Sequence, residues 1–164
     1  MQKLLLVEDD PALQFTIQTA LEEKGYAVDA VSSTGEAIER LSGGAYPIVI
    51  SDIYIDERTG LDVLDAAKRK DPLCSVILMT GRGTVETVIQ ATRGGAFDYI
   101  AKPFDLDVML GAIEQAQAEG LAAVDFLRRP EAYKYRWGAR DRATLRIHVR
   151  RDAVLSKIHD QRAA

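Results

Sequence analysis

Short apolar segments alternate with longer amphipathic segments along most of the chain. The apolar segments are hydrophobic at successive positions, as in LLLV, PIVI and SVILM, which is typical of strands buried on both faces of a sheet. We predict five strands, at 4–7, 26–31, 46–51, 74–80 and 97–101. The intervening segments repeat apolar residues at the helical period and predict helices over 11–24, 34–42, 60–70, 84–94 and from 106 to about 128.

Strict alternation of strands and helices predicts the fold class. Parallel neighbouring strands need a crossover connection, which is usually a helix. We therefore expect an α/β fold in which a five-stranded parallel sheet is covered by helices on both faces. In such open sheets, ligands bind beyond the carboxyl ends of the strands. The residues that end or follow each strand are thus the first candidates for a functional site.

Charged and hydroxyl side chains stand at four of these strand ends. Glu8 and Asp9 follow the first strand, and Asp52 ends the third. Thr80 ends the fourth strand, and Lys102 follows the fifth. Because the carboxyl ends of parallel strands meet at one rim of the sheet, we expect these side chains to converge there.

Neighbouring carboxylates repel one another unless a cation compensates their charge. Oxygen ligands suit Mg²⁺, which commonly shares a phosphate group with one or two carboxylates. In such a site Lys102 would supply a positive charge and Thr80 a hydroxyl donor to the phosphoryl group. Asp52 is the candidate nucleophile, which would give an aspartyl phosphate. Asp10 has a different interpretation, because Asp followed by Pro11 is typical of a helix start.

Composition places further bounds on the protein. The 164 residues suffice for one domain of ordinary size, and 47% apolar with 28% charged residues is typical of a globular protein. No apolar run is long enough to span a bilayer and no signal peptide is evident, so we expect a cytoplasmic location without membrane contact. The single cysteine, Cys74, excludes an internal disulfide framework and is expected in the core.

Charge is distributed unevenly along the chain. Residues 1–120 contain 10 Lys and Arg against 20 Asp and Glu, whereas residues 121–164 contain 11 against 5. An acidic body followed by a basic extension implies two parts with different partners.

Four sequence segments share a recognisable pattern: LLVEDD, SDIYIDERTG, ILMTG and GAFDYIAKPFDLD. Together they resemble the receiver domain of bacterial two-component response regulators, and the resemblance covers residues 1–119. It implies a doubly wound, flavodoxin-like sheet of strand order 2-1-3-4-5 and phosphorylation of Asp52 by a partner sensor histidine kinase. It further implies a signalling module that is not itself an enzyme. The segment GAFDYIAKPFDLD is most similar to receivers of the nitrogen-regulator class, which control ATPase activators of the alternative sigma factor.

The resemblance also implies a magnesium site. Glu8 and Asp9 match the acidic pair of the family, with Asp9 the more direct ligand. Asp52 and the backbone carbonyl of Tyr54 would complete the protein ligands of Mg²⁺.

A switch is implied as well. Thr80 and Tyr99 match the switch pair, and Lys102 matches the phosphate-binding lysine, whose bond to Pro103 would be cis. Phosphorylation would alter the surface formed by the fourth helix, the fifth strand and the fifth helix, and would serve transcriptional or other signalling control. A homodimer is left open.

One residue departs from the family pattern. Asp56 stands where receivers usually have proline, and we expect its side chain to point to solvent.

Three rival functions follow from other interpretations. A degenerate receiver would act as a phosphorylation-independent interaction module. An aspartate-dependent phosphatase would need a second acid at position 54, which is Tyr54. A flavin carrier would need a Ser-, Thr- or Gly-rich phosphate loop after the first strand, where this chain has EDDPA.

The basic extension, residues 120–164, has its own pattern. AYKYRW and TLRIHVR alternate in polarity and predict a β-hairpin, followed by a short helix over 152–159. The extension shows no Gly-rich phosphate loop ending in GK. Three hypotheses stay open: a docking or dimer-forming element, a nucleic-acid contact that uses aromatic and basic side chains, or a remnant of a longer protein.

Overall fold

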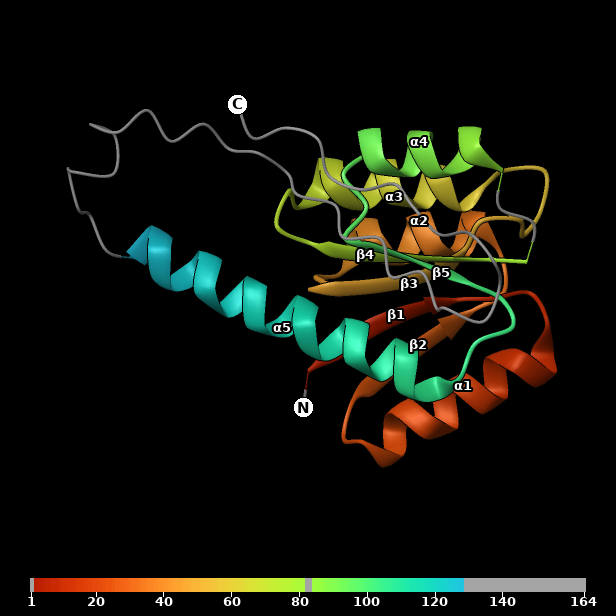
Figure 1. The fold of residues 1–164 in the computed structure, drawn as a ribbon, viewed down its shortest axis with the longest axis horizontal. Helices are drawn as coiled ribbons and strands as arrows, with labels where there is room; N and C mark the ends of the chain where they lie inside the picture. The colour runs from red at the N-terminus through yellow and green to blue at the C-terminus, as the bar shows by residue number, and fades with distance from the viewer. Residues whose placement is uncertain (1, 82–83, 129–164) are drawn as a thin grey trace, which may run out of the picture.

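A five-stranded parallel sheet forms the centre of the protein. The computed structural model describes residues 2–81 and 84–128, with side chains described up to residue 120. The strands are ordered β2-β1-β3-β4-β5 (Figure 1), which confirms the predicted order. Their bounds are β1 Lys3–Val7, β2 Ala27–Val31, β3 Ile48–Asp52, β4 Ser75–Thr80 and β5 Asp98–Ala101.

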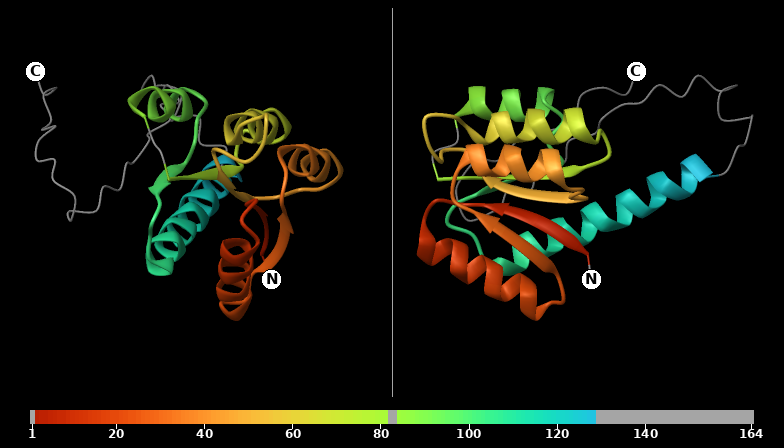
Figure 2. Two further views of the ribbon diagram at one scale, coloured as in Figure 1. Left: turned by 90° about the vertical axis from the view of Figure 1, so that its right-hand side faces the viewer. Right: turned by 180° about the vertical axis from the view of Figure 1, so that it is seen from behind.

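Helices cover both faces of the sheet, as predicted. They are α1 Pro11–Glu23, α2 Thr34–Gly43, α3 Gly60–Lys70, α4 Val85–Arg93 and α5 Leu106–Arg128. α2, α3 and α4 lie side by side on one face, and α1 and α5 lie on the other (Figures 1 and 2). The predicted bounds of all ten elements agree with these to within two residues. The α/β, doubly wound fold class is therefore confirmed.

The continuous hydrophobicity of the central strands follows from two separate cores. Successive residues of a strand point to opposite faces, so Leu5 and Val49 pack toward α2 and α3. Leu4 and Ile50 pack on the opposite face toward α1 and α5. Cys74 is buried in the first of these cores, where burial raises the pKa of its thiol to about 12. The thiol is thus a core group, as expected, and stays protonated at neutral pH.

The first helix begins where the sequence predicts it, because Asp10 and Pro11 favour a helix start at this position. The Asp10 side chain accepts hydrogen bonds from the amide groups of Ala12 (2.8 Å) and Leu13 (3.1 Å). Pro11 occupies the first helical position, where its missing N–H costs nothing. Asp10 is therefore the N-cap of α1, which fixes how the chain leaves β1.

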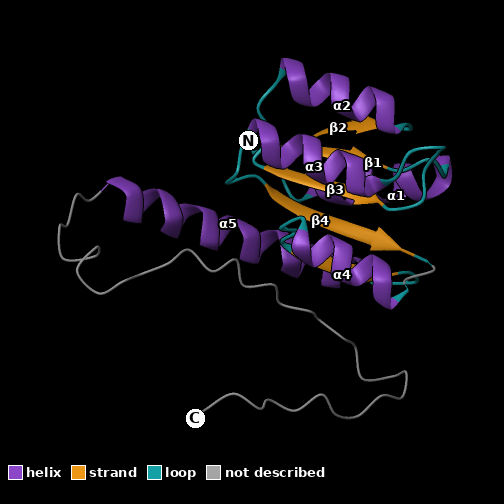
Figure 3. Ribbon diagram, turned by 90° about the horizontal axis from the view of Figure 1, so that it is seen from above, coloured by secondary structure: helices purple, strands orange, loops and turns teal. Residues whose placement is uncertain are grey.

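The last helix reaches beyond the sheet. α5 continues past the amino ends of the strands (Figure 3). It runs through position 120, so the predicted boundary between body and extension falls inside one helix. The hairpin and the short helix predicted for the basic extension lie outside the described residues. Within the described ranges, no helix combines the length and apolarity that crossing a membrane would require.

Candidate functional site

Three carboxylates meet at the carboxyl rim of the sheet. One ligand oxygen each from Glu8, Asp9 and Asp52 lies within 4.8 Å of the others. Glu8 and Asp52 are buried, whereas Asp9 is exposed. The group therefore offers oxygen ligands with one side open to solvent, which suits a hard divalent cation such as Mg²⁺. The predicted acidic cluster is thus present in the fold.

A lysine joins two of these carboxylates. Nζ of Lys102 lies 2.7 Å from Oε2 of Glu8 and 2.5 Å from Oδ2 of Asp52. The lysine side chain is only 18% exposed. The peptide bond between Lys102 and Pro103 is cis, as the resemblance implied. An ammonium group is therefore held beside the candidate nucleophile.

Burial and pairing act in opposite directions on this cluster. Burial raises the pKa of Glu8, and the hydrogen bond from Lys102 offsets this only in part. Burial by itself would lower the pKa of Lys102, but its hydrogen bonds to Asp52 and Glu8 outweigh that effect and raise it. Lys102 is therefore charged at neutral pH. One ammonium cannot neutralise three ionised carboxylates, and the residues present leave negative charge that a divalent cation would balance.

The backbone around Asp52 is held tightly. The amide of Tyr54 donates to Oδ1 of Asp52 at 3.2 Å, while Lys102 binds Oδ2. The Ser51 hydroxyl donates to the Asp52 carbonyl at 2.8 Å. Gly60 approaches so closely that a Cβ at that position would lie 2.1 Å from the same carbonyl oxygen. Both carboxylate oxygens of Asp52 thus have fixed partners, and the first turn of α3 packs directly on its backbone.

Gln14 supports the loop after β1 and was not predicted from the sequence. Its Nε2 donates to the carbonyls of Glu8 and Val31, each at 2.8 Å. The side chain therefore ties the acidic end of β1 to the end of β2. No sequence signal marks this role, because it depends on how α1 folds back over the rim.

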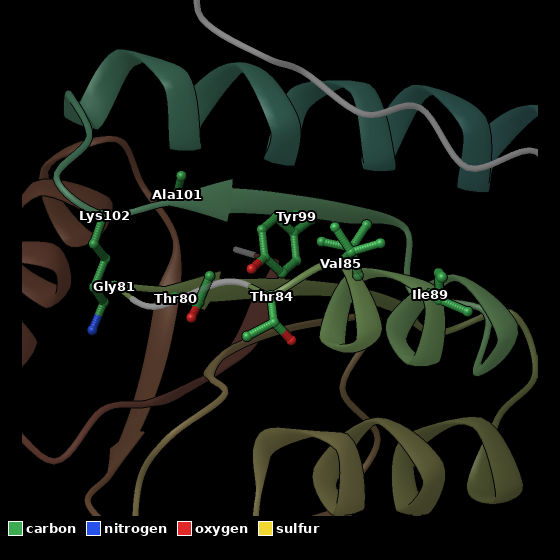
Figure 4. A pocket seen from close by; sticks show the side chains of 9 residues that line it. Thr80, Gly81, Thr84, Val85, Ile89, Tyr99, Ala101 and Lys102 are labelled. Atoms are coloured by element: carbon green, nitrogen blue, oxygen red, sulfur yellow. The ribbon is translucent and has the colours of Figure 1, made fainter. Parts of the chain in front are cut away.

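Thr80 and Tyr99 line a cavity beside the acidic cluster (Figure 4). The cavity has a volume of about 340 Å³ and lies between β5 and α4, with Val85 and Ile89 of α4 on its wall. Thr80 is buried at the end of β4. Lys102 also reaches the cavity, so that it connects the acidic cluster with the proposed switch pair.

The Tyr99 hydroxyl is buried in this region. Burial raises its pKa. The side chain of Thr80 lies near enough to favour the ionised form of the Tyr99 hydroxyl and so offsets part of this rise in pKa. No hydrogen bond of accepted geometry reaches the Tyr99 hydroxyl from the described residues. The Tyr99 ring is therefore packed inward, while its hydroxyl contributes little stabilisation in that position.

The side chain of Tyr54 reaches from the acceptor loop to α4. The residue is 48% exposed, and its hydroxyl lies 3.4 Å from Oγ1 of Thr87. Oγ1 of Thr87 in turn lies 2.9 Å from Oγ1 of Thr84, the N-cap of α4. Tyr54 thus contacts Asp52 through its backbone and α4 through its side chain.

The expectation for Asp56 is confirmed in part, because the residue is exposed and lies outside the carboxylate cluster. Its side chain is exposed, but it does not simply point to solvent: Oδ2 accepts the Thr34 amide at 2.9 Å and Oδ1 accepts the Arg58 amide at 2.8 Å. The hydrogen bond from Thr34 is the main reason why the pKa of Asp56 is lowered. Asp56 is not a member of the carboxylate cluster, so its charge is directed to α2 and not to the metal position.

The fold and this rim define a class of protein. A parallel sheet of order β2-β1-β3-β4-β5, with acidic residues and a lysine gathered at its carboxyl edge, is a doubly wound fold with an anionic pocket at the topological switch point. The family model of the response regulator receiver domain matches residues 4–114, and the chain belongs to that family.

Individual relatives agree with this assignment. The acid tolerance regulatory protein ActR of Rhizobium meliloti is 33% identical over 118 residues, which cover 72% of this chain and 61% of ActR. The DNA-binding transcriptional regulator NtrC of the same species is 32% identical over 116 residues, or 71% of this chain and 24% of NtrC. The chain therefore spans only part of these curated relatives.

A solved structure shows the same fold. The beryllofluoride-activated NtrC4 receiver domain dimer is 29% identical to this chain, with a TM-score of 0.69 over 73% of this chain and 99% of that chain. NtrC-like proteins thus occur among both the relatives and the structural neighbours, which agrees with the resemblance to the nitrogen-regulator class.

Proposed function

We propose that this receiver accepts a phosphoryl group on Asp52 from a sensor histidine kinase and signals through protein contacts, without turning over a substrate as an enzyme does. The observation that carries the proposal is the contact of Lys102 with both Glu8 and Asp52 at the rim. Glu8, Asp9, Asp52 and the carbonyl of Tyr54 would hold Mg²⁺. The bound ion would neutralise the charge on the transferring phosphoryl group.

The residues of the chain perform the transfer itself. An Asp52 carboxylate oxygen attacks phosphorus, the new O–P bond forms, and the N–P bond to the kinase histidine breaks with its electron pair returning to the imidazole. Lys102 then exchanges part of its contact with Asp52 for a phosphoryl oxygen, and the Thr80 hydroxyl donates to another. Glu8 keeps the ammonium charged and in place throughout.

A switch would follow from these movements. Turning Thr80 toward the phosphoryl group changes the wall of the cavity beside Tyr99. The Tyr99 ring and the first turn of α4 would then repack, which alters the surface formed by α4, β5 and α5. Such a transition selects between packed arrangements that already exist.

Partners and output follow from the family. The relatives are named transcriptional regulators, which supports transcriptional control as the output. The dimer described for the NtrC4 receiver supports a second copy of this chain as a partner. We propose a cytoplasmic location, because a response regulator receives its signal there. Contact of the basic extension with nucleic acid stays a hypothesis.

Intact mass spectrometry tests the proposal. Incubation with Mg²⁺ and a small phosphodonor should add one phosphoryl group, and Asp52→Asn or removal of Mg²⁺ by a chelator should abolish the addition. Asp65→Asn is a matched control, because Asp65 is an exposed carboxylate of α3 that pairs with Arg69. Size-exclusion chromatography of the same samples would report dimer formation. A parent protein that takes up no phosphoryl group would favour the phosphorylation-independent interaction module instead.

A further inference from the structure

Asp56 connects the acceptor loop to a helix that is distant in sequence. The loop runs from the end of β3 at Asp52 to the start of α3 at Gly60, and Asp56 lies between them. Its Oδ2 accepts the amide of Thr34 at 2.9 Å, across 22 positions of the chain. Thr34 is the first residue of α2, which lies beside α3 on the same face of the sheet (Figure 3). The contact is therefore tertiary.

The chemistry of this contact favours an ionised carboxylate. The first amide groups of a helix have no partner inside the helix, and they lie at the positive end of its dipole. The α2 N-cap, Ser33, uses its own side chain to accept the amide of Glu36. The Thr34 amide is satisfied by Asp56 instead. A charge-assisted hydrogen bond of this kind is stronger than one between neutral groups.

The rest of the loop is restrained at its base. Tyr54 and Thr59 form an isolated antiparallel bridge, which closes the loop below Asp56. Gly60 packs on the Asp52 carbonyl, and the Tyr54 amide is bonded to the Asp52 side chain. The hydrogen bonds of Asp56 to Thr34 and to Arg58 hold the remaining part. Loss of Asp56 would thus remove the polar anchors of the segment after Tyr54 and leave it held by the packing of Ile55 on the core.

We propose that Asp56 is a positioning residue for the magnesium site: it anchors the acceptor loop to α2 and so keeps the Tyr54 carbonyl where a metal ligand is needed. This inference rests on the proposed function. Asp56 itself does not reach the carboxylate cluster, so its substitution removes no ligand. Asp56 acts by keeping the acceptor loop ordered. Without it, the conformational entropy of the loop would be lost when Mg²⁺ binds, which would weaken binding.

The test compares Asp56→Ala with two variants at the other end of the contact. Thr34→Pro removes the donor N–H together with the buried Thr34 hydroxyl. The helix start itself should tolerate the change, because proline is favoured at the first helical position and Ser33 has the extended backbone that precedes proline well. Ser33→Ala removes the cap of the same helix without touching the acceptor loop, and it is the control for a general weakening of α2. Asp56→Asn keeps one carbonyl acceptor and should restore part of the effect.

Mg²⁺ affinity is measured by calorimetry, and amide hydrogen exchange is measured without metal. We expect Asp56→Ala to raise the Kd for Mg²⁺ about tenfold, the lower end of what loss of an outer contact costs a metal site. Exchange at Thr34 and Tyr54 should become faster, while the phosphorylation rate at saturating Mg²⁺ stays close to that of the parent. The double variant Asp56→Ala/Thr34→Pro should bind Mg²⁺ no more weakly than the weaker of the two single variants.

An unchanged Kd in Asp56→Ala would overturn the inference, and so would an equal rise in Kd for Ser33→Ala. A double variant with additive effects would do so as well, since the two groups would then act separately. A parent protein that binds Mg²⁺ but accepts no phosphoryl group would overturn the proposed function and leave this inference standing.

Discussion

Lys102 Nζ lies 2.5 Å from Oδ2 of Asp52, which joins the loop after β5 to the end of β3 across 50 positions of the chain. The same nitrogen binds Glu8 at the end of β1, across 94 positions. Burial disfavours the charges of Glu8 and Lys102, and the lysine is what allows the two buried carboxylates to stay close together. The candidate site is therefore also a point of long-range contact in the fold.

Replacing Lys102 by methionine should destabilise the protein without Mg²⁺. The substitution leaves Glu8 and Asp52 buried without their cation, and the free energy of unfolding should fall by about 3 kcal/mol. Urea unfolding measures the loss, and added Mg²⁺ should recover part of it. Arg69→Ala, which breaks an exposed pair with Asp65, should cost only about 0.5 kcal/mol. A loss in Lys102→Met no larger than that would contradict the prediction.

Gly60→Ala should be among the most damaging single-methyl additions. The new Cβ would lie 2.1 Å from the Asp52 carbonyl oxygen, which is backbone and cannot rotate away. We expect the free energy of unfolding to fall by about 3 kcal/mol, through overpacking next to the acceptor. Gly35→Ala in α2 is the control, since among the described residues no atom outside its neighbours and the backbone of its own helix lies within 4 Å of its Cβ position. It should stabilise the helix by about 0.5 kcal/mol, so equal thermal shifts in the two variants would refute the steric interpretation.

Tyr99→Phe should leave stability unchanged or raise it by up to about 1 kcal/mol. The variant keeps the packed ring and removes a buried hydroxyl that no hydrogen bond of accepted geometry satisfies among the described residues. Tyr46→Phe offers the contrast, because the Tyr46 hydroxyl donates to Asp29 at 2.5 Å and should cost about 1 kcal/mol when removed. Thermal unfolding of both variants distinguishes the two hydroxyls. A clear loss of stability in Tyr99→Phe would mean that its hydroxyl has a partner of real strength.

The stability that Asp29 contributes should depend on pH in the acidic range below 3.8. Tyr46 chiefly, then Lys3, hold the pKa of Asp29 below its usual 3.8. The folded state therefore binds fewer protons than the unfolded state, and the stabilisation is present above pH 3.8 and lost as the pH falls through the folded pKa. Asp29→Asn should be less stable than the parent by about 1 kcal/mol at neutral pH. Unfolding curves of the two proteins should converge in acid; a gap that persists unchanged there would contradict the assignment.

Periodicity and strand-end chemistry were enough to predict the α/β fold class and the convergence of Glu8, Asp52 and Lys102, whereas the strand order came from the resemblance to receivers. Continuous apolar runs such as LLLV mark strands with two buried faces, and the structure shows those faces as two cores. The cap at Asp10 depends on residues within one helical turn, so it too could be predicted. Placement of Glu8, Asp9 and Asp52 at one rim followed from the parallel sheet. The functional roles of these residues remain predictions.

Contacts between distant segments could not be predicted in the same way. The role of Asp56 depends on where the start of α2 lies relative to the acceptor loop, and nothing near either residue in sequence indicates that distance. Gln14 reaches two strand ends only because α1 packs back over them. In both cases a polar side chain satisfies a backbone group of another element, and only the assembled fold shows which group that is.

The length of α5 gives the molecule a lever. Gln117 still touches the body through Gln2, at 2.7 Å, and the helix then continues to Arg128. At about 1.5 Å per residue, the part of the helix beyond Gln117 is roughly 16 Å long, so a tilt of about 10° there would move the end of the helix by roughly 3 Å. Any such displacement would be largest at the projecting end of α5, which contains the first residues of the basic extension.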